Sequence, residues 1–482
     1  MRRRLLLALI ALLLAGSSAI ASPSSRLAPK VDAPDEPLSS PNVSLVAHFP
    51  DPGATGGRFV GKYFYMTSSG PALIAPGPTG GLRIFDASNP ELPVLVGFLP
   101  LPHYENEDVD VAPERHLVLI SMDKQSSNPS IAGALFIVDV MNPALPALRS
   151  VVQYPATVGE VDDPSPTSVT HKKYMGGPGH IANCILQCRF AYVTGARNGT
   201  IFVIDLRNVD APAIMGTFKT PAAKANPVFT QPAVHDVNVD PQGYVWMTGS
   251  GGTAMYAPVK NPLRPKLLAW VSPRDNVRYD QFIHHNSLRL NKDTVLVTEE
   301  DWEQPQCGRD EDIKAADKTI IGKGEQGSFQ AWHIAAPKLT PLGTWQTELG
   351  DYLDGGAAVT IVCSSHWFSF NRSKVVAVGW YNQGLRFLDV SNPRHIRQVG
   401  YWMGPMTTAS AGLFVPGRGD IAYSVDYTRG LDVLKIADGG RNAITVRAPV
   451  RAEWFTDYAG VRFAQALRPD DAFGWACARP AA

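Results

Sequence analysis

A glycine-led element recurs seven times along the chain. Its clearest copy, Gly81-Leu-Arg-Ile-Phe-Asp-Ala-Ser-Asn-Pro90, reads as a short apolar strand followed by an Asn-Pro turn. Successive copies begin 46 to 75 residues apart, a period that suits four-stranded blades with loop insertions. The sequence therefore predicts an all-β fold, a seven-bladed β-propeller. The remaining copies begin at Gly133, Gly199, Gly252, Gly327, Gly384 and Gly430.

The two ends of the repeat region complement each other. The seventh copy ends near Ile436 without an outer strand, and the alternating stretch Val43–Phe49 has nothing before it to pair with. We expect this N-terminal strand to complete the seventh blade, because closure removes an open sheet edge. The predicted organisation is a signal peptide (1–21), a flexible lead-in (22–42), the propeller (43–437) and an aromatic-containing C-terminal extension packed on it (438–482).

The glycine-led element resembles the repeat of the LVIVD β-propeller proteins, a family of bacterial exports. The element is best preserved at 81–97 and 384–400, and the resemblance covers nearly all of 43–437. It implies the propeller fold. It implies little about activity, because propellers serve both as enzymes and as binding scaffolds.

The N-terminus predicts export. Arg2-Arg3-Arg4 precede an apolar core, and Ala19-Ile20-Ala21 forms a small-residue cleavage site. No later segment approaches the 18 apolar residues typical of a membrane-spanning helix, so we expect a secreted or periplasmic protein without a transmembrane segment. The 44 basic and 44 acidic residues balance, which argues against a nucleic-acid partner.

Five cysteines are available to an exported chain, where disulfides can form. Cys184 and Cys188 flank a turn, and we predict a disulfide that staples it, with redox chemistry or soft-metal ligation as alternatives. Cys307 with Cys363 is a weaker pairing, which leaves Cys477 unpaired.

Four histidines hold the same position in four successive repeats. In a propeller the first strand of each blade lines the central channel, so equivalent positions meet near the axis. Converging imidazoles are the donors that a transition metal requires. The alternative is that each imidazole bonds only to a neighbouring inner strand. The predicted metal ligands are His180, His235, His285 and His366.

Other polar residues are expected near this level. Glu107 fills the matching position of the second blade and is predicted to be a base or a fifth ligand. Asp236 and Glu300 are candidates to accept the second N–H of the histidines, with ordinary turn chemistry as the alternative. His284 is predicted to lie behind the ligands, because neighbours on a strand point to opposite faces and the register favours His285.

The predicted cofactor is a transition metal, with iron or copper favoured and zinc as a further option. The arrangement is similar to that of the carotenoid-cleaving oxygenases, whose propellers hold iron with four histidines. The His235-Asp236-Val237 strand also resembles one in the selenium-binding/methanethiol oxidase propellers. The resulting hypothesis is an exported metal-dependent oxidoreductase with a small-molecule substrate. The alternatives are a non-catalytic binding propeller and a zinc-dependent hydrolase.

Overall fold

The computed structural model describes most of the repeat region. The described residues are 37–69, 80–101, 109–122, 133–155, 157–162, 172–176, 179–195, 199–223, 234–271, 283–300, 327–349, 364–405 and 407–449. The predicted signal peptide lies outside them. Within the described ranges, no helix is long and apolar enough to cross a membrane.

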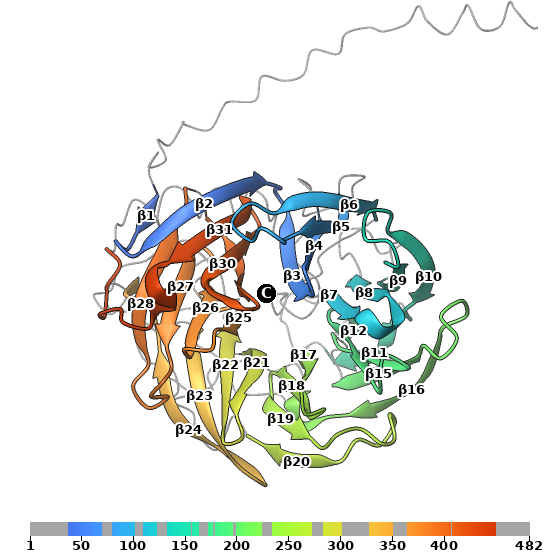
Figure 1. Cartoon of the computed structure of the whole chain (residues 1–482). Coiled ribbons are helices and arrows are strands. Elements are labelled where there is room, and N and C mark those ends of the chain that lie inside the picture. The colour runs from blue at the N-terminus through green and yellow to red at the C-terminus, as the bar shows by residue number, and fades with distance from the viewer. Residues whose placement is uncertain are drawn as a thin grey trace, which may run out of the picture. The chain divides into compact units, whose positions relative to one another are not determined.

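The regular structure is almost entirely β, as predicted, and its sheets surround a common centre (Figure 1). Three sheets have four antiparallel strands each. They are β3 (Ala54–Val60), β4 (Tyr63–Ser68), β5 (Gly81–Asp86) and β6 (Val94–Pro100); β7 (Val109–Ala112), β8 (Leu117–Met122), β9 (Ala134–Asp139) and β10 (Ala147–Gln153); and β13 (Ala182–Ile185), β14 (Phe190–Val193), β15 (Thr200–Asp205) and β16 (Ala213–Lys219). A two-stranded sheet, β11 (Thr157–Asp162) with β12 (Lys172–Gly176), precedes β13 in the chain.

Two larger sheets each combine two antiparallel sets through a short parallel contact. In the eight-stranded sheet Trp270 of β20 pairs with Lys338 of β24, and in the nine-stranded sheet β25 pairs with β29. The first contains β17 (Val234–Val239), β18 (Val245–Gly249), β19 (Gly252–Tyr256), β20 (Leu267–Trp270), β21 (Ile283–Asn291), β22 (Thr294–Glu300), β23 (Phe329–Ala335) and β24 (Lys338–Trp345). The second contains β1 (Leu38–Ser39), β2 (Val43–Pro50), β25 (Trp367–Phe370), β26 (Val375–Gly379), β27 (Leu385–Asp389), β28 (Arg397–Met403), β29 (Ala409–Val415), β30 (Arg418–Asp426) and β31 (Gly430–Ile436).

The strands nearest the centre contact one another in a closed series. β3 contacts β7, and the series continues through β13, β17, β21, β25 and β29, which contacts β3 again. The outermost strands of each set, such as β6, β10 and β16, lie at the periphery (Figure 1). The architecture is therefore propeller-like, and the first strand of each set lines the centre.

Burial follows this arrangement. The second and third strands of a set, such as β8 and β9, are buried along almost their whole length, because each sheet packs against a neighbour on both faces. Outer strands alternate between exposed and partly buried residues, as β16 does. The apolar core consequently lies between the sheets and not on the axis, which leaves the axis to polar side chains.

The N-terminal strand completes the last set. β2 pairs antiparallel with β31 from Val43↔Ile436 to Pro50↔Gly430, as the sequence predicts. The imidazole of His48 on β2 lies 2.7 Å from Asp432 on β31, and Arg429 donates to the same carboxylate at 2.7 Å. The first and last strands of the repeat region are thus joined by an antiparallel ladder with one irregularity between Leu45 and Ala47.

Order extends into the stretch predicted as a flexible lead-in. Leu38 and Ser39 form β1, which pairs with Met403 and Trp402 of β28, and the buried Ser40 donates its N–H to Tyr401. This pairing depends on an edge supplied by distant residues, so local composition gives no sign of it.

The start of the C-terminal extension lies against β28. The N–H of Val446 donates to the carbonyl oxygen of Gln398 at 3.0 Å, and the N–H of Ala448 donates to Glu348 at 2.9 Å. Glu348 also forms a buried ion pair with Arg386 at 3.4 Å, and burial lowers the pKa of this arginine. Residues 450–482, which include every aromatic residue of the extension, lie outside the described part of the chain.

The closure by β2 can be tested by truncation. A chain that begins at Asp51 should have a lower melting temperature and should aggregate, because β31 would present an unpaired edge. A chain that begins at Ser22 retains β2 and serves as the control. Equal melting temperatures for the two chains, measured by circular dichroism, would contradict a stabilising role for the β2–β31 ladder.

Candidate metal centre

The four predicted histidines lie at the same end of four successive inner strands. His235 and His285 lie near the beginnings of β17 and β21, His366 immediately precedes β25, and His180 lies two residues before β13. All four are fully buried, with an exposed fraction of 0%. Four imidazoles shielded from water are therefore presented by four neighbouring sets of strands.

The imidazoles form a continuous arc. The ring centroids of consecutive histidines are 4.3 Å apart for His180 and His235, 3.9 Å for His235 and His285, and 4.0 Å for His285 and His366. The Nε2 atoms of His180 and His235 are 3.0 Å apart. The structure thus brings together the side chains that the sequence aligns.

A carboxylate faces the same nitrogen atoms. Glu300, fully buried at the end of β22, has its Oε2 3.4 Å from Nε2 of His235 and 3.8 Å from Nε2 of His285. Its Oε1 lies 3.4 Å from Nε2 of His366. The ligand atoms of His235, His285 and Glu300 all lie within 4.8 Å of one another. Glu300, predicted to stand behind the ligands, therefore lies where a ligand would.

The protonation of His366 follows from its neighbour. Its Nδ1 lies 2.7 Å from the carbonyl oxygen of Ser410. A carbonyl oxygen only accepts hydrogen bonds, so Nδ1 carries the proton. In the neutral ring, Nε2 then directs a lone pair toward Glu300, which is the arrangement of a metal-ligating histidine with its second N–H on a backbone carbonyl.

These spacings fit one ion. With metal–nitrogen bonds of 2.0–2.1 Å, adjacent ligand atoms lie about 2.9 Å apart at right angles and about 3.3 Å apart in a tetrahedron. The Nε2–Nε2 distance of 3.0 Å and the 3.4 Å from Glu300 Oε2 to His235 Nε2 fall close to this range, while the 3.8 Å from Oε2 to His285 Nε2 is longer. A buried carboxylate also needs a compensating positive charge, which a divalent ion supplies.

Threonine hydroxyls hold the histidine backbones. Thr194, after β14, donates to the carbonyl oxygen of His235 at 2.6 Å. Thr248 in β18 donates in the same way to the carbonyl oxygen of His285 at 2.6 Å. Each threonine belongs to the preceding set of strands, so the second strand of one set positions the histidine of the next.

The remaining predicted residues have other surroundings. His284 places its Nδ1 2.7 Å from Thr253 Oγ1, on the opposite side of the strand from its neighbour. Asp236 accepts hydrogen bonds from the amides of Asn286 at 2.9 Å and Asn238 at 3.3 Å. Asp236 therefore connects β17 to β21. Glu107 lies outside the described residues.

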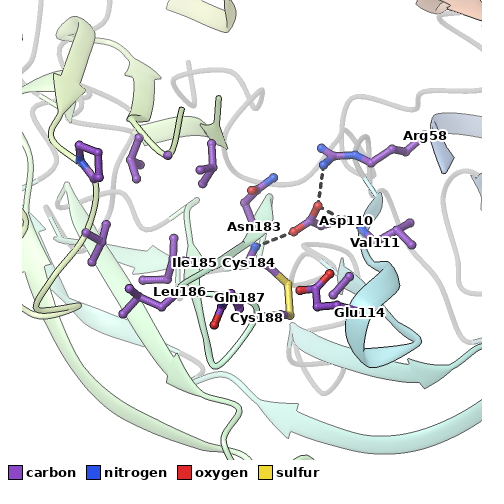
Figure 2. A pocket seen from close by; sticks show the side chains of 16 residues that line it. Arg58, Asp110, Val111, Glu114, Asn183, Cys184, Ile185, Leu186, Gln187 and Cys188 are labelled. Carbon is purple, nitrogen blue, oxygen red and sulfur yellow. Dashed lines mark hydrogen bonds and ion pairs between the residues drawn. A yellow bond between two sulfur atoms is a disulfide. The ribbon is translucent and has the colours of Figure 1, made fainter. Parts of the chain in front are cut away.

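Cys184 and Cys188 form a disulfide across the turn between β13 and β14. The turn borders a cavity of about 400 Å³, in which Asp110 accepts hydrogen bonds from Arg58 at 2.5 Å and from the backbone N–H of Cys184 at 2.6 Å (Figure 2). This cavity lies where β13 ends, whereas His180 precedes that strand. Cys307, Cys363 and Cys477 lie outside the described part of the chain.

Sequence reasoning missed two tyrosines beside the centre. Tyr381 donates its hydroxyl proton to Glu300, and its ring centroid lies 4.5 Å from that of His366. The ring of Tyr427 stacks on Tyr381 at 6.3 Å. A signal did exist, because each tyrosine lies three residues before a recurring glycine, Gly384 or Gly430.

The threonine contacts predict an effect on metal binding. Thr248→Val keeps the side-chain shape but removes the hydroxyl that orients His285, so we expect metal affinity to fall about tenfold. Chelator competition measures this change, and Thr340→Val on an exposed part of β24 is the matched control. Equal affinities in the two variants would show that the hydroxyl does not orient the ligand.

Comparisons with known proteins support the fold alone. No protein-family model matches the chain, and no curated protein matches its sequence. A solved structure of a protein from Lactobacillus plantarum is similar to this chain at 9% identity, covering 84% of this chain and 97% of its own, with a TM-score of 0.54. Hydrazine synthase from Kuenenia stuttgartiensis matches at 10% identity over 81% of this chain and 97% of its own, with a TM-score of 0.47. The Lactobacillus likeness is consistent with a β-propeller and assigns no residue role.

Proposed function

We propose that the chain is an exported β-propeller enzyme, an oxidoreductase that holds one transition metal on its axis and acts on a small molecule. The observation behind the proposal is that Nε2 atoms of His235, His285 and His366 all face one buried carboxylate, Glu300. His180 joins them through His235 at 3.0 Å.

Hydrogen bonding alone explains the cluster less well than a metal does. His366 donates its N–H to Ser410, so Nε2 of the neutral ring carries a lone pair. This nitrogen lies 3.4 Å from Oε1 of Glu300, which also carries lone pairs, and the two atoms repel each other. A cation relieves that repulsion. The competing explanation is an additional proton on the imidazoles, and metal analysis distinguishes the two.

We propose seven blades of the LVIVD type, and the order of the strands supports the number of blades. Each inner strand in the closed series begins a set of four, and the last set takes β2 as its fourth strand. In this assignment the short parallel contacts of β20 with β24 and of β25 with β29 join neighbouring blades.

The ligand atoms limit which metal ions the site can bind. Imidazole and carboxylate ligands without a thiolate suit iron(II), copper(II) and zinc. Iron or copper at this site supplies oxidation–reduction chemistry, whereas zinc supplies Lewis-acid chemistry. We favour iron or copper. The role proposed for Glu107 is that of a base at the matching position of the second blade.

Export rests on the N-terminal sequence and on the disulfide. A positively charged segment, an apolar core and a small-residue site form the signal pattern of residues 1–21. The Cys184–Cys188 disulfide is the kind of bond that persists in an oxidising compartment.

A non-catalytic binding propeller is the second candidate. Large apolar side chains are exposed on the outer strands β6 and β10 and the turn before β10, which is a feature of interaction surfaces. They are Leu95 (50% exposed), Phe98 (43%), Leu145 (74%) and Leu148 (44%).

Metal analysis of the purified chain tests the proposal. Protein from metal-replete cells should contain about one equivalent of iron or copper by plasma mass spectrometry, and His235→Ala should lose most of it. His395→Ala, at an exposed turn, should retain the wild-type content.

Three outcomes separate the candidates. Folded, metal-free wild-type protein that also fails to bind added metal would contradict an axial metal centre and favour the binding propeller. Bound zinc with oxygen-independent hydrolysis would favour the hydrolase. Bound iron or copper with a redox-active spectrum supports the oxidoreductase.

A further inference from the structure

Tyr381 contacts two members of the cluster at once. It lies in the turn between β26 and β27, and its side chain is fully buried. Its hydroxyl donates to Glu300 Oε1, and its ring lies against the imidazole of His366. A single side chain thus touches both the carboxylate and one of the imidazoles that face it.

The backbone at Tyr381 holds an unfavourable conformation. Its φ is 36°, in the left-handed region that a residue with a Cβ atom seldom adopts. The N–H of Tyr381 donates to Ala409 at 3.0 Å, and the N–H of Ala409 donates back to Tyr381 at 2.8 Å. This reciprocal pair of bonds to β29 maintains the conformation. Strained backbone held in this way is common where a side chain must point in one direction.

The hydroxyl of Tyr381 gives the two carboxylate oxygens of Glu300 different partners. A phenol donates and a carboxylate accepts, so the proton of Tyr381 engages a lone pair of Oε1. Oε2 of the same carboxylate remains directed at His235, 3.4 Å away, and at His285, 3.8 Å away. The contact therefore fixes the rotation of the carboxylate about its own axis.

A second tyrosine supports the first. The Tyr427 ring is stacked on Tyr381 with an interplanar angle of 9°. Its backbone N–H donates to Thr408 at 3.0 Å, one residue before the Ala409 that holds Tyr381. The rings of Tyr381, Tyr427 and His366 thus form one cluster, because the centroid of His366 also lies 6.5 Å from that of Tyr427.

We propose that Tyr381 is the positioning residue of the metal centre. It orients Glu300 so that Oε2 coordinates the ion, while Oε1 remains hydrogen-bonded to the phenol. This role rests on the proposed function, because it requires a metal between Glu300 and the histidines. Tyr381 acts through Glu300 and needs no contact with the substrate.

Removing one hydroxyl tests the role. Tyr381→Phe keeps the ring and its stacking, so the fold should persist, but metal affinity should fall roughly 10- to 100-fold. The d–d spectrum of the cobalt(II)-loaded protein should also change, because the carboxylate is free to rotate. Tyr423→Phe is the matched control, since Tyr423 is equally buried and donates to Pro90 at 3.0 Å.

A double-mutant cycle identifies the route of the effect. In the Glu300→Gln background, Tyr381→Phe should change cobalt affinity little further, because the group that it positions is already altered. Additive losses would mean that the hydroxyl acts on something other than Glu300, and would overturn the proposal.

A second substitution tests the role if the Tyr381→Phe variant does not fold. Tyr381→3-fluorotyrosine preserves the ring and makes the hydroxyl more acidic, so the cobalt spectrum should shift, whereas the same substitution at Tyr423 should leave it unchanged. An unchanged affinity and spectrum in both Tyr381 variants would overturn the positioning role. If the wild-type protein binds neither its native metal nor cobalt, the proposed function itself fails, and this role fails with it.

Discussion

Closure of the ring is the constraint on which the candidate centre depends. The inner strands begin at one end of the molecule, and the β2–β31 ladder keeps the first and last sets of strands together. Because the series of inner strands closes on itself, side chains at equivalent positions are directed to one region. His180, His235, His285 and His366 meet there although 186 residues separate the first from the last.

A closed ring alone would place the imidazoles only approximately. Hydrogen bonds between neighbouring sets of strands position them further. Thr194 and Thr248 bond to the backbone carbonyl oxygens of His235 and His285, and the imidazole of His366 bonds to Ser410. Each bond crosses from one set to the next, so contacts that join the sheets also position the histidines.

Sequence patterns predict the parts that depend on periodicity. The glycine-led element indicates the sheets, the unpaired Val43–Phe49 stretch indicates the closing strand, and alternation along β21 separates His284 from His285. Contacts made by residues in turns and at strand ends are harder to predict from the sequence. Glu300 reaches the imidazoles from the end of a second strand. Tyr381 precedes a recurring glycine, but its left-handed backbone and its contact with Glu300 do not follow from the repeat. The pairing of β1 with β28 is likewise set by tertiary contact.

X-ray absorption spectroscopy at the edge of the bound metal shows which atoms coordinate it. We expect a first shell of nitrogen and oxygen atoms near 2.0–2.1 Å, with the multiple scattering of several imidazoles and loss of the signal in His235→Ala. A shell that contains sulfur, or one of oxygen alone without imidazole scattering, would contradict a metal held by the four histidines and Glu300.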